Sequence, residues 1–222
     1  MWCIAKITPE YRRRMYKVLN LYNKKYDEKY PVVCVDEKSK QLLGEIRKPI
    51  PMKEGSPAKH DYEYKRNGTS NIFVAVEPKA GNHFLKVTKR RTKQDFAIFI
   101  KELLMKYKKA NKIQLVADNL NTHFEKSFYE TFKKSEAIKI LERIKFIYTP
   151  KHASWLNMAE IEINMLETEC LDRKIETHDK LIREVSAWEL EKNKTKKMIQ
   201  WNFTKKKADM KLSADEFYKI IF

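Results

Sequence analysis

Five short runs of β-branched and other apolar residues, separated by segments with helical periodicity, constrain the fold of this chain most strongly. The runs span residues 32–35, 72–76, 84–87, 113–117 and 144–148. Runs of this length are typical of buried strands. Residues 78–81 (PKAG), between the second and third runs, form a turn signal and predict a hairpin. The pattern therefore predicts an α/β fold with a five-stranded mixed sheet and helices on both faces.

The remaining segments predict helices and one long loop. Apolar residues at helical spacing indicate helices at residues 94–108, 124–134, 156–171 and 177–194, with a last short one near 213–221. Thr92 is expected to be the N-cap of the 94–108 helix. Residues 38–71 include Pro49, Pro51, Pro57, Gly55 and Gly68 and are predicted to be mostly loop.

The N-terminal segment also has helical spacing. Met15, Val18, Leu19 and Tyr22 recur at intervals that place them on one face of a helix, and Tyr30-Pro31 is expected to end it. The chain accordingly divides into a helical lead-in at 1–30, a central α/β domain at 31–175 and a basic helical extension at 176–222.

The charge balance points to a polyanionic partner. The 47 Lys and Arg residues outnumber the 30 Asp and Glu residues and give a net charge of +17. Self-repulsion of this size is typical of proteins that bind nucleic acid. A lysine-rich proteome from an AT-rich genome would produce part of the same excess, but a nucleic-acid partner is the favoured interpretation.

Cysteine usage and hydropathy indicate where the protein resides. Cys3, Cys34 and Cys170 are odd in number and widely spaced, which predicts reduced thiols rather than disulfides or a zinc site. No apolar run approaches the roughly 18 residues that a membrane helix needs, and no secretory leader is evident at the N-terminus. The expected location is the cytoplasm, with no membrane association.

Three acidic residues stand where α/β sheets usually carry their chemistry. Asp36 is expected to end the first strand, Asp118 follows the fourth, and Glu160 lies in the first turns of the helix after the last strand. If the first and fourth strands are neighbours, the two aspartates emerge side by side. Clustered carboxylates repel one another unless a cation is bound, and hard cations such as Mg²⁺ or Mn²⁺ prefer oxygen ligands. Taken singly, each acid is more simply a loop cap or a solvated helix residue.

Several blocks of sequence carry a family resemblance. They are VVCVDE (32–37), YEY (62–64) with NGTSN (67–71), RRT (90–92), LVADNLNTH (115–123) and TPKHASWLNMAE (149–160). With these blocks in this order, the chain resembles the DDE transposases of bacterial insertion sequences related to the mariner superfamily. The resemblance runs from residue 2 to about residue 203. It implies a ribonuclease H-like fold for the central domain.

The resemblance also implies a metal-binding catalytic triad. Matched block by block, the triad is Asp36, Asp118 and Glu160, which would bind two Mg²⁺ or Mn²⁺ ions. Glu162 and Glu167 on the same predicted helix are competitors, but Glu160 follows the Leu-Asn-x-x-Glu pattern.

Other residues of the matching blocks are candidates for supporting roles. Asn119, His123 and Asn157 are expected to surround the triad, with His123 near phosphate or buried and hydrogen-bonded, and Asn157 orienting the carboxylate of Glu160 or capping the helix. Glu37 is expected to point away from Asp36 because side chains alternate along a strand.

Four basic residues are candidates for contact with the DNA backbone. Arg90 and Arg91 precede a helix N-terminus, which favours phosphate contact. Lys151 and His152 are alternatively residues of an ordinary solvated loop.

The function implied by the resemblance is cut-and-paste transposition. The chain would cleave double-stranded DNA at transposon ends and join the freed 3′-hydroxyl to target DNA, acting as a homodimer. Family members carry helix-turn-helix modules before the catalytic domain, and this chain starts just before that domain. It is therefore expected to be a fragment, or the downstream product of a split reading frame that works with an upstream helix-turn-helix chain. The alternatives are a non-enzymatic DNA-binding remnant and another ribonuclease H-like nuclease.

Overall fold

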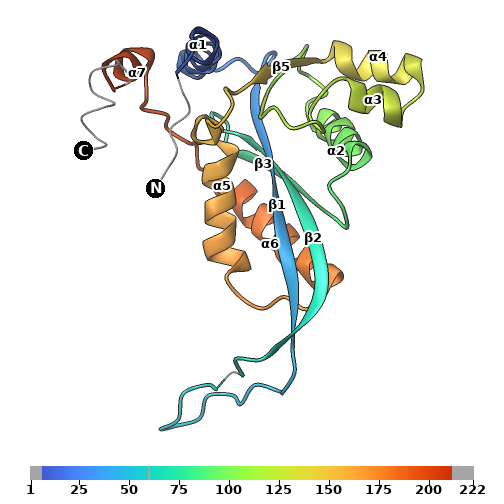
Figure 1. Ribbon diagram of the computed structural model, residues 1–222, viewed down its shortest axis with the longest axis vertical. Helices are drawn as coiled ribbons and strands as arrows, with labels where there is room; N and C mark the ends of the chain where they lie inside the picture. Colours follow the sequence, from blue (N-terminus) through green and yellow to red (C-terminus); the bar gives the residue numbers. More distant parts are fainter. Residues whose placement is uncertain (1–6, 60, 212–222) are drawn as a thin grey trace.

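The computed structural model describes residues 7–59 and 61–211 and contains one mixed sheet with strand order β3-β2-β1-β4-β5 (Figure 1). The strands are β1 (Val32–Glu45), β2 (Tyr64–Glu77), β3 (Asn82–Thr88), β4 (Ile113–Ala117) and β5 (Ile144–Tyr148). β1–β2 and β2–β3 pair antiparallel, whereas β1–β4 and β4–β5 pair parallel. The predicted five-stranded mixed sheet, including the β2–β3 hairpin, is confirmed.

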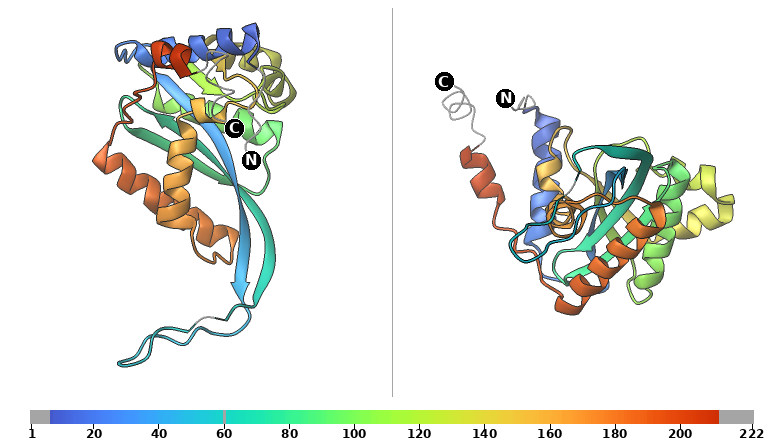
Figure 2. Two further views of the ribbon diagram at one scale, coloured as in Figure 1. Left: turned by 60° about the vertical axis from the view of Figure 1, so that its left-hand side comes forward. Right: turned by 90° about the horizontal axis from the view of Figure 1, so that it is seen from below.

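Helices cover both faces of the sheet. Successive strand residues point to opposite faces, and here the residues on each face are apolar. On one face, Val33 and Phe73 pack with α2 (Lys93–Lys106), α3 (Lys126–Thr131) and α4 (Lys134–Glu142). On the other face lie α1 (Pro9–Asn23), α5 (Ala159–Leu166) and α6 (His178–Thr195), against residues such as Cys34 and Val74 (Figure 2). Strands that are buried on both faces need near-continuous apolar runs, which is why these strands were readable from the sequence.

The predicted helix starts and stripes are largely confirmed. Met15, Val18, Leu19 and Tyr22 all face the sheet from α1, although the helix ends at Asn23, before Tyr30-Pro31. Thr92 is the N-cap of α2, and its hydroxyl accepts a hydrogen bond from the Asp95 amide while the Asp95 carboxylate accepts one from the Thr92 amide. This reciprocal pair satisfies two backbone donors at the helix start.

The prediction of a loop over 38–71 is wrong for most of that segment. β1 continues to Glu45 and β2 begins at Tyr64, and the two form a long ribbon that projects beyond the helices (Figures 1 and 2). The ribbon is largely polar because much of it is exposed, so its sequence lacks the apolar runs of a buried strand, while its backbone hydrogen bonds do not depend on side-chain type. The prolines lie in the actual connection at residues 46–63.

Two helix predictions need correction, and two helices were missed. The predicted 124–134 helix is only α3, which ends at Thr131 because Phe132 and Lys133 leave the helical conformation, and the separate helix α4 that follows was not predicted. The predicted 156–171 helix consists of a 3₁₀ turn η1 (Ser154–Leu156), α5 and a π-helical turn η2 (Glu167–Leu171). A short helix α7 (Lys205–Lys211) was not predicted, and the helix expected near 213–221 lies outside the described residues.

The described residues also bear on the thiols and on membrane crossing. Cys34 and Cys170 are buried free thiols, and Cys3 lies outside the described residues. Within 7–59 and 61–211, none of the helices combines the length and apolar character that crossing a bilayer requires. α1 and α6 both pack on the sheet, and the boundaries at 30/31 and 175/176 stay a prediction.

Gly81, in the β2–β3 turn, lies directly against the backbone at the end of α6. Its φ is +65°, and a Cβ there would lie 2.4 Å from the backbone carbonyl of Lys196 at the end of α6. Gly81→Ala should lower the free energy of unfolding by about 3 kcal/mol, from left-handed strain and overpacking together. Gly55→Ala is the control: its φ is +74° but its Cβ would meet no atom within 4 Å. It should cost only about 1–2 kcal/mol. Equal losses in urea titrations of the two variants would contradict the close approach.

Candidate active site

Asp36 and Asp118 lie side by side because β1 and β4 are parallel neighbours. Their register pairs Cys34 with Val116, and two further residues along each chain bring Asp36 level with Asp118. Asp36 lies two residues after Cys34, and Asp118 two residues after its partner Val116. Side chains two residues apart share a face of the sheet, so both carboxylates belong to the face covered by α1 and α5. The prediction that Asp36 ends a strand is wrong, since β1 continues past it. The expected position of Asp118, directly after β4, is confirmed.

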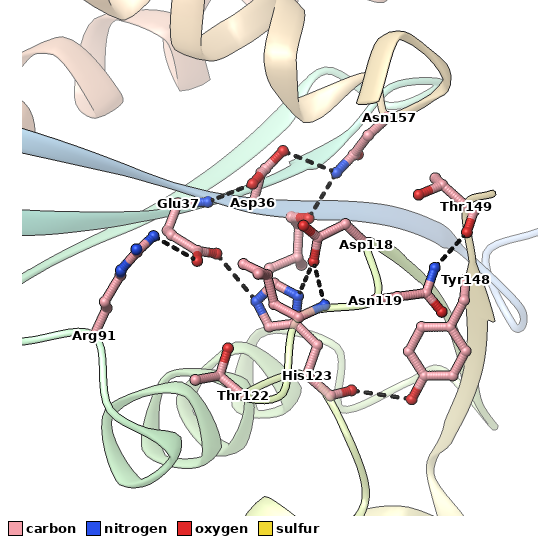
Figure 3. A network of polar contacts seen from close by, with 12 residues as sticks. Asp36, Glu37, Arg91, Asp118, Asn119, Thr122, His123, Tyr148, Thr149 and Asn157 are labelled. Atoms are coloured by element: carbon pink, nitrogen blue, oxygen red, sulfur yellow. Dashed lines mark hydrogen bonds and ion pairs between the residues drawn. The ribbon is translucent and has the colours of Figure 1, made fainter. Parts of the chain in front are cut away.

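Asp36 is held by two hydrogen bonds within a mostly buried setting (Figure 3). Its Oδ1 accepts from the Glu37 amide at 2.8 Å, and its Oδ2 accepts from Asn157 Nδ2 at 3.2 Å. Burial raises the pKa of Asp36 to about 7, the Glu37 amide opposes this, and the negative charges of Glu37, Asp118 and Glu160 add to the rise. Asp36 is thus half protonated near neutral pH, and a nearby cation would favour its charged form.

Glu160 enters the site from the first turn of α5, as predicted. Its amide donates to the carbonyl of Asn157 at 3.1 Å, and its charge is among those that raise the pKa of Asp36. Asn157 itself precedes the helix and contacts Asp36, rather than orienting the Glu160 carboxylate. Its Nδ2 also donates to the Val35 carbonyl at 2.8 Å, and its Oδ1 accepts from the Ala159 amide at 3.2 Å. One side chain therefore joins the start of α5 to β1.

His123 connects two acids beneath the site. Its Nδ1 lies 2.7 Å from Asp118 Oδ1 and its Nε2 lies 3.0 Å from Glu37 Oε2. The imidazole side chain is 0% exposed and the Glu37 side chain 3%. Glu37 projects to the face opposite Asp36, as expected from strand alternation, and there it also contacts Arg91 at 3.5 Å. His123 is thus a buried residue that orients Asp118.

The pKa values of His123 and Asp118 follow from this contact. Burial alone would lower the pKa of His123, but its hydrogen bond to Asp118, its close contact with Glu37 and the negative charges of both outweigh it and raise the pKa to about 9. Burial would raise the pKa of Asp118, but the hydrogen bond and positive charge of His123 hold it below the ordinary value. A protonated His123 and an ionised Asp118 therefore form one coupled pair, whereas Asp36 has no such cation.

Asn119 links the turn after β4 to α1. Its Nδ2 donates to the Thr149 carbonyl at 2.6 Å, and its Oδ1 accepts from Arg14 Nη1 at 2.6 Å. Arg14 also pairs with Glu10 at 2.8 Å, four residues earlier on α1. Sequence reasoning did not identify Arg14. The Glu10–Arg14 helical spacing was visible, but nothing in the sequence indicated that α1 lies beside the turn after β4.

The predicted DNA-contacting residues come from two segments, one before α2 and one after β5. Arg90 and Arg91 are exposed before α2. Lys151 and His152 are exposed in the turn after β5, where His152 has a φ of +56°. The turn lines an open pocket of about 620 Å³, together with Thr8, Glu10, Tyr11 and Arg14. No described contact engages the charged ends of Arg90, Lys151 or His152 with another side chain, so these groups are available to a ligand.

The residues present suit a hard divalent cation by type and position. The negative charges of Asp118 and Glu160 add to the raised pKa of Asp36, which a bound cation would lower again. Among the described residues, no three acidic, imidazole or thiol groups converge closely enough to enclose a metal ion. Binding would therefore require the carboxylates to close on the ion.

Comparison with known proteins identifies the family. Residues 31–182 match the family described as DDE superfamily endonuclease. This chain is a DDE superfamily endonuclease. The match covers most of the chain and includes all three carboxylates. No curated protein sequence matches it.

Solved structures of Mos1 transposase share the fold of this DDE endonuclease. "Mos1 transposase paired-end complex with left transposon end" has 13% identity and a TM-score of 0.57, covering 86% of this chain and 57% of that one. "Crystal structure of the Mos1 mariner paired end complex with Mn" has 14% identity, a TM-score of 0.55 and coverages of 89% and 60%. The chain therefore spans less than two thirds of the Mos1 chains. The likeness confirms the predicted ribonuclease H-like fold.

The His123 contacts predict how stability changes with pH in metal-free protein. A folded-state pKa of about 9 lies above the unfolded value near 6.5, so the contribution of His123 is fully present below about pH 6.5 and lost as pH rises through about 9. The stability advantage of the parent over His123→Gln should therefore shrink between pH 6 and pH 9.5. Urea unfolding with a chelator present measures this difference in the free energy of unfolding. A difference that stays constant from pH 6 to pH 9.5 would rule out a charged imidazole.

Proposed function

We propose that this chain is the catalytic domain of a cut-and-paste transposase that cleaves DNA strands and transfers them to a target. The observation that carries the proposal is that Asp36 and Asp118 follow neighbouring parallel strands within a matched DDE endonuclease segment, with the charge of Glu160 on α5 acting on Asp36. The structural neighbours include "Crystal structure of the Mos1 Strand Transfer Complex", at 12% identity. Their printed names mention Mn and Mg, which supports a divalent metal here.

The three carboxylates would hold two Mg²⁺ or Mn²⁺ ions. Such ions activate the attacking oxygen and stabilise the developing charge on the phosphate and leaving oxygen. Asp118 is presented in its ionised form by His123 Nδ1, and Asp36 is oriented by the Glu37 amide and Asn157. Glu160 closes the third side from α5.

The flanking basic residues would position the DNA backbone. Arg90 and Arg91 lie on the β3–α2 side of the site, and Lys151 and His152 on the β5–η1 side. Double-stranded DNA of transposon ends and of the target is the proposed substrate, handled by a homodimer, with an upstream helix-turn-helix segment recognising the ends. Phosphate contacts of this kind fix the register of a duplex without reading its sequence.

Nicking of supercoiled plasmid tests the proposed chemistry. In Mn²⁺ the parent should nick, and Asp118→Asn should be slower by on the order of 100-fold or more, because it removes a charge that the reaction requires while keeping the shape of the side chain. Glu130→Gln, an exposed substitution on α3, is the matched control and should nick at the parental rate. Equal nicking by the parent and Asp118→Asn would exclude the proposed site. No nicking by any of the three would favour a DNA-binding remnant.

Salt dependence tests the proposed DNA surface. Affinity for a duplex should fall steeply as salt rises, and Lys151→Ala should reduce the slope of log affinity against log salt by about 0.9 for one lost phosphate contact. Lys109→Ala removes the same charge from an exposed position before β4, at the opposite end of that strand from Asp118. Its slope should stay parental. The surface is misassigned if Lys109→Ala changes the slope as much as Lys151→Ala does.

A further inference from the structure

α5 presents two acidic side chains on different flanks. The helix has eight residues and lacks a side-chain hydrogen bond from its N-cap, Met158. Its buried residues include Glu162 and Ile163. At about 100° per residue, Glu160 and Glu162 project about 200° apart around the axis. Glu160 acts on Asp36, whereas Glu162 turns toward β3.

Glu162 meets a buried histidine on β3. Its Oε2 lies 2.9 Å from His83 Nε2, and the two side chains are 5% and 2% exposed. The two groups are not aligned for a straight hydrogen bond, so this is a close polar contact between two buried side chains. His83 Nδ1 lies 3.2 Å from the Gly81 carbonyl, which can only accept, so Nδ1 carries a hydrogen. The ring edge also packs on Trp188, with centroids 5.9 Å apart.

The backbone of His83 is also held in place, by two hydrogen bonds with α6. β3 is an edge strand, and Asn193 of α6 takes the place of a missing neighbour: its Oδ1 accepts from the His83 amide at 2.8 Å and its Nδ2 donates to the His83 carbonyl at 2.9 Å. Trp188 of α6 donates to Glu169 of η2 at 2.7 Å, beyond the other end of α5. His83 is thus anchored to β3 and α6, and α5 is held from the flank opposite Glu160.

We propose that His83 and Glu162 are positioning residues that set the rotation of α5 so that Glu160 faces Asp36 and Asp118. This rests on the proposed metal-dependent function. The hydrophobic driving force is non-directional, whereas a buried polar contact joins two particular atoms and so restricts the rotation of a short helix more narrowly. Rotating α5 would leave a buried carboxyl without its partner, which is strongly unfavourable. The pair therefore selects one rotation, and it acts on the reaction only through Glu160.

Mn²⁺ alone, titrated into the full chain and followed by paramagnetic resonance of the free ion, measures the effect without turnover. Glu162→Ala should raise the Kd for Mn²⁺ about tenfold, as loss of residues that orient metal ligands does elsewhere. Glu162→Gln keeps the shape and a polar contact to His83 and should stay close to the parent. Val185→Ala removes buried volume from the same face and is the control for general destabilisation. It should unfold earlier but bind Mn²⁺ as the parent does.

The possible outcomes are distinct. The inference is supported if Glu162→Ala binds Mn²⁺ more weakly than the parent while Glu162→Gln and Val185→Ala bind it with parental affinity. If Glu162→Ala binds Mn²⁺ as tightly as the parent, or if Val185→Ala loses as much affinity, the pair has no positioning role, while the proposed function stands. A parent that neither binds Mn²⁺ nor nicks plasmid overturns the proposed function, and this inference with it.

Discussion

The parallel pairing of β1 with β4 is the constraint on which the rest of the site depends. Strands pair about 4.8 Å apart, so a register that matches Cys34 with Val116 brings Asp36 and Asp118 together whatever the surrounding side chains do. The two positions differ in rigidity. β1 runs on past Asp36 into the ribbon, whereas β4 ends before Asp118, which stands at the start of a turn. The backbone of Asp36 is therefore fixed by the sheet, whereas Asp118 is positioned by its hydrogen bonds.

Burying a charged carboxylate is unfavourable unless a positive group compensates it, and the two aspartates are compensated to different degrees. Asp118 receives His123, whose other ring nitrogen contacts Glu37 on the opposite face of the sheet. Among the described residues, the hydrogen-bond donors to Asp36 are uncharged, the Glu37 amide and Asn157, and its pKa stays near 7 because of burial and neighbouring negative charge. The two neighbouring aspartates therefore differ in ionisation. Under the proposed function, Asp36 is the ligand that gains most from a divalent cation, and metal binding there should release protons.

The third carboxylate depends on contacts far from it in sequence. α5 is short and weakly capped, so its orientation comes from what surrounds it: Asn157 joins its start to β1, and Glu162 meets His83 on β3. β3 in turn is closed along its free edge by Asn193 of α6. α6 thereby supports the candidate site indirectly, because it stabilises the strand against which α5 is oriented.

The sequence by itself determined the five strands, most helices and the three acids of the candidate site, since apolar periodicity and motif blocks are local properties. It misjudged the β1–β2 ribbon, because an exposed strand pair is held by backbone hydrogen bonds and need not be apolar. Only the tertiary structure decided that Arg14 contacts Asn119, that His123 lies between Asp118 and Glu37, and that His83 pairs with Glu162. These contacts join residues whose spacing follows no helical or strand period. They exist because particular strands and helices became neighbours, and neither composition nor periodicity encodes that.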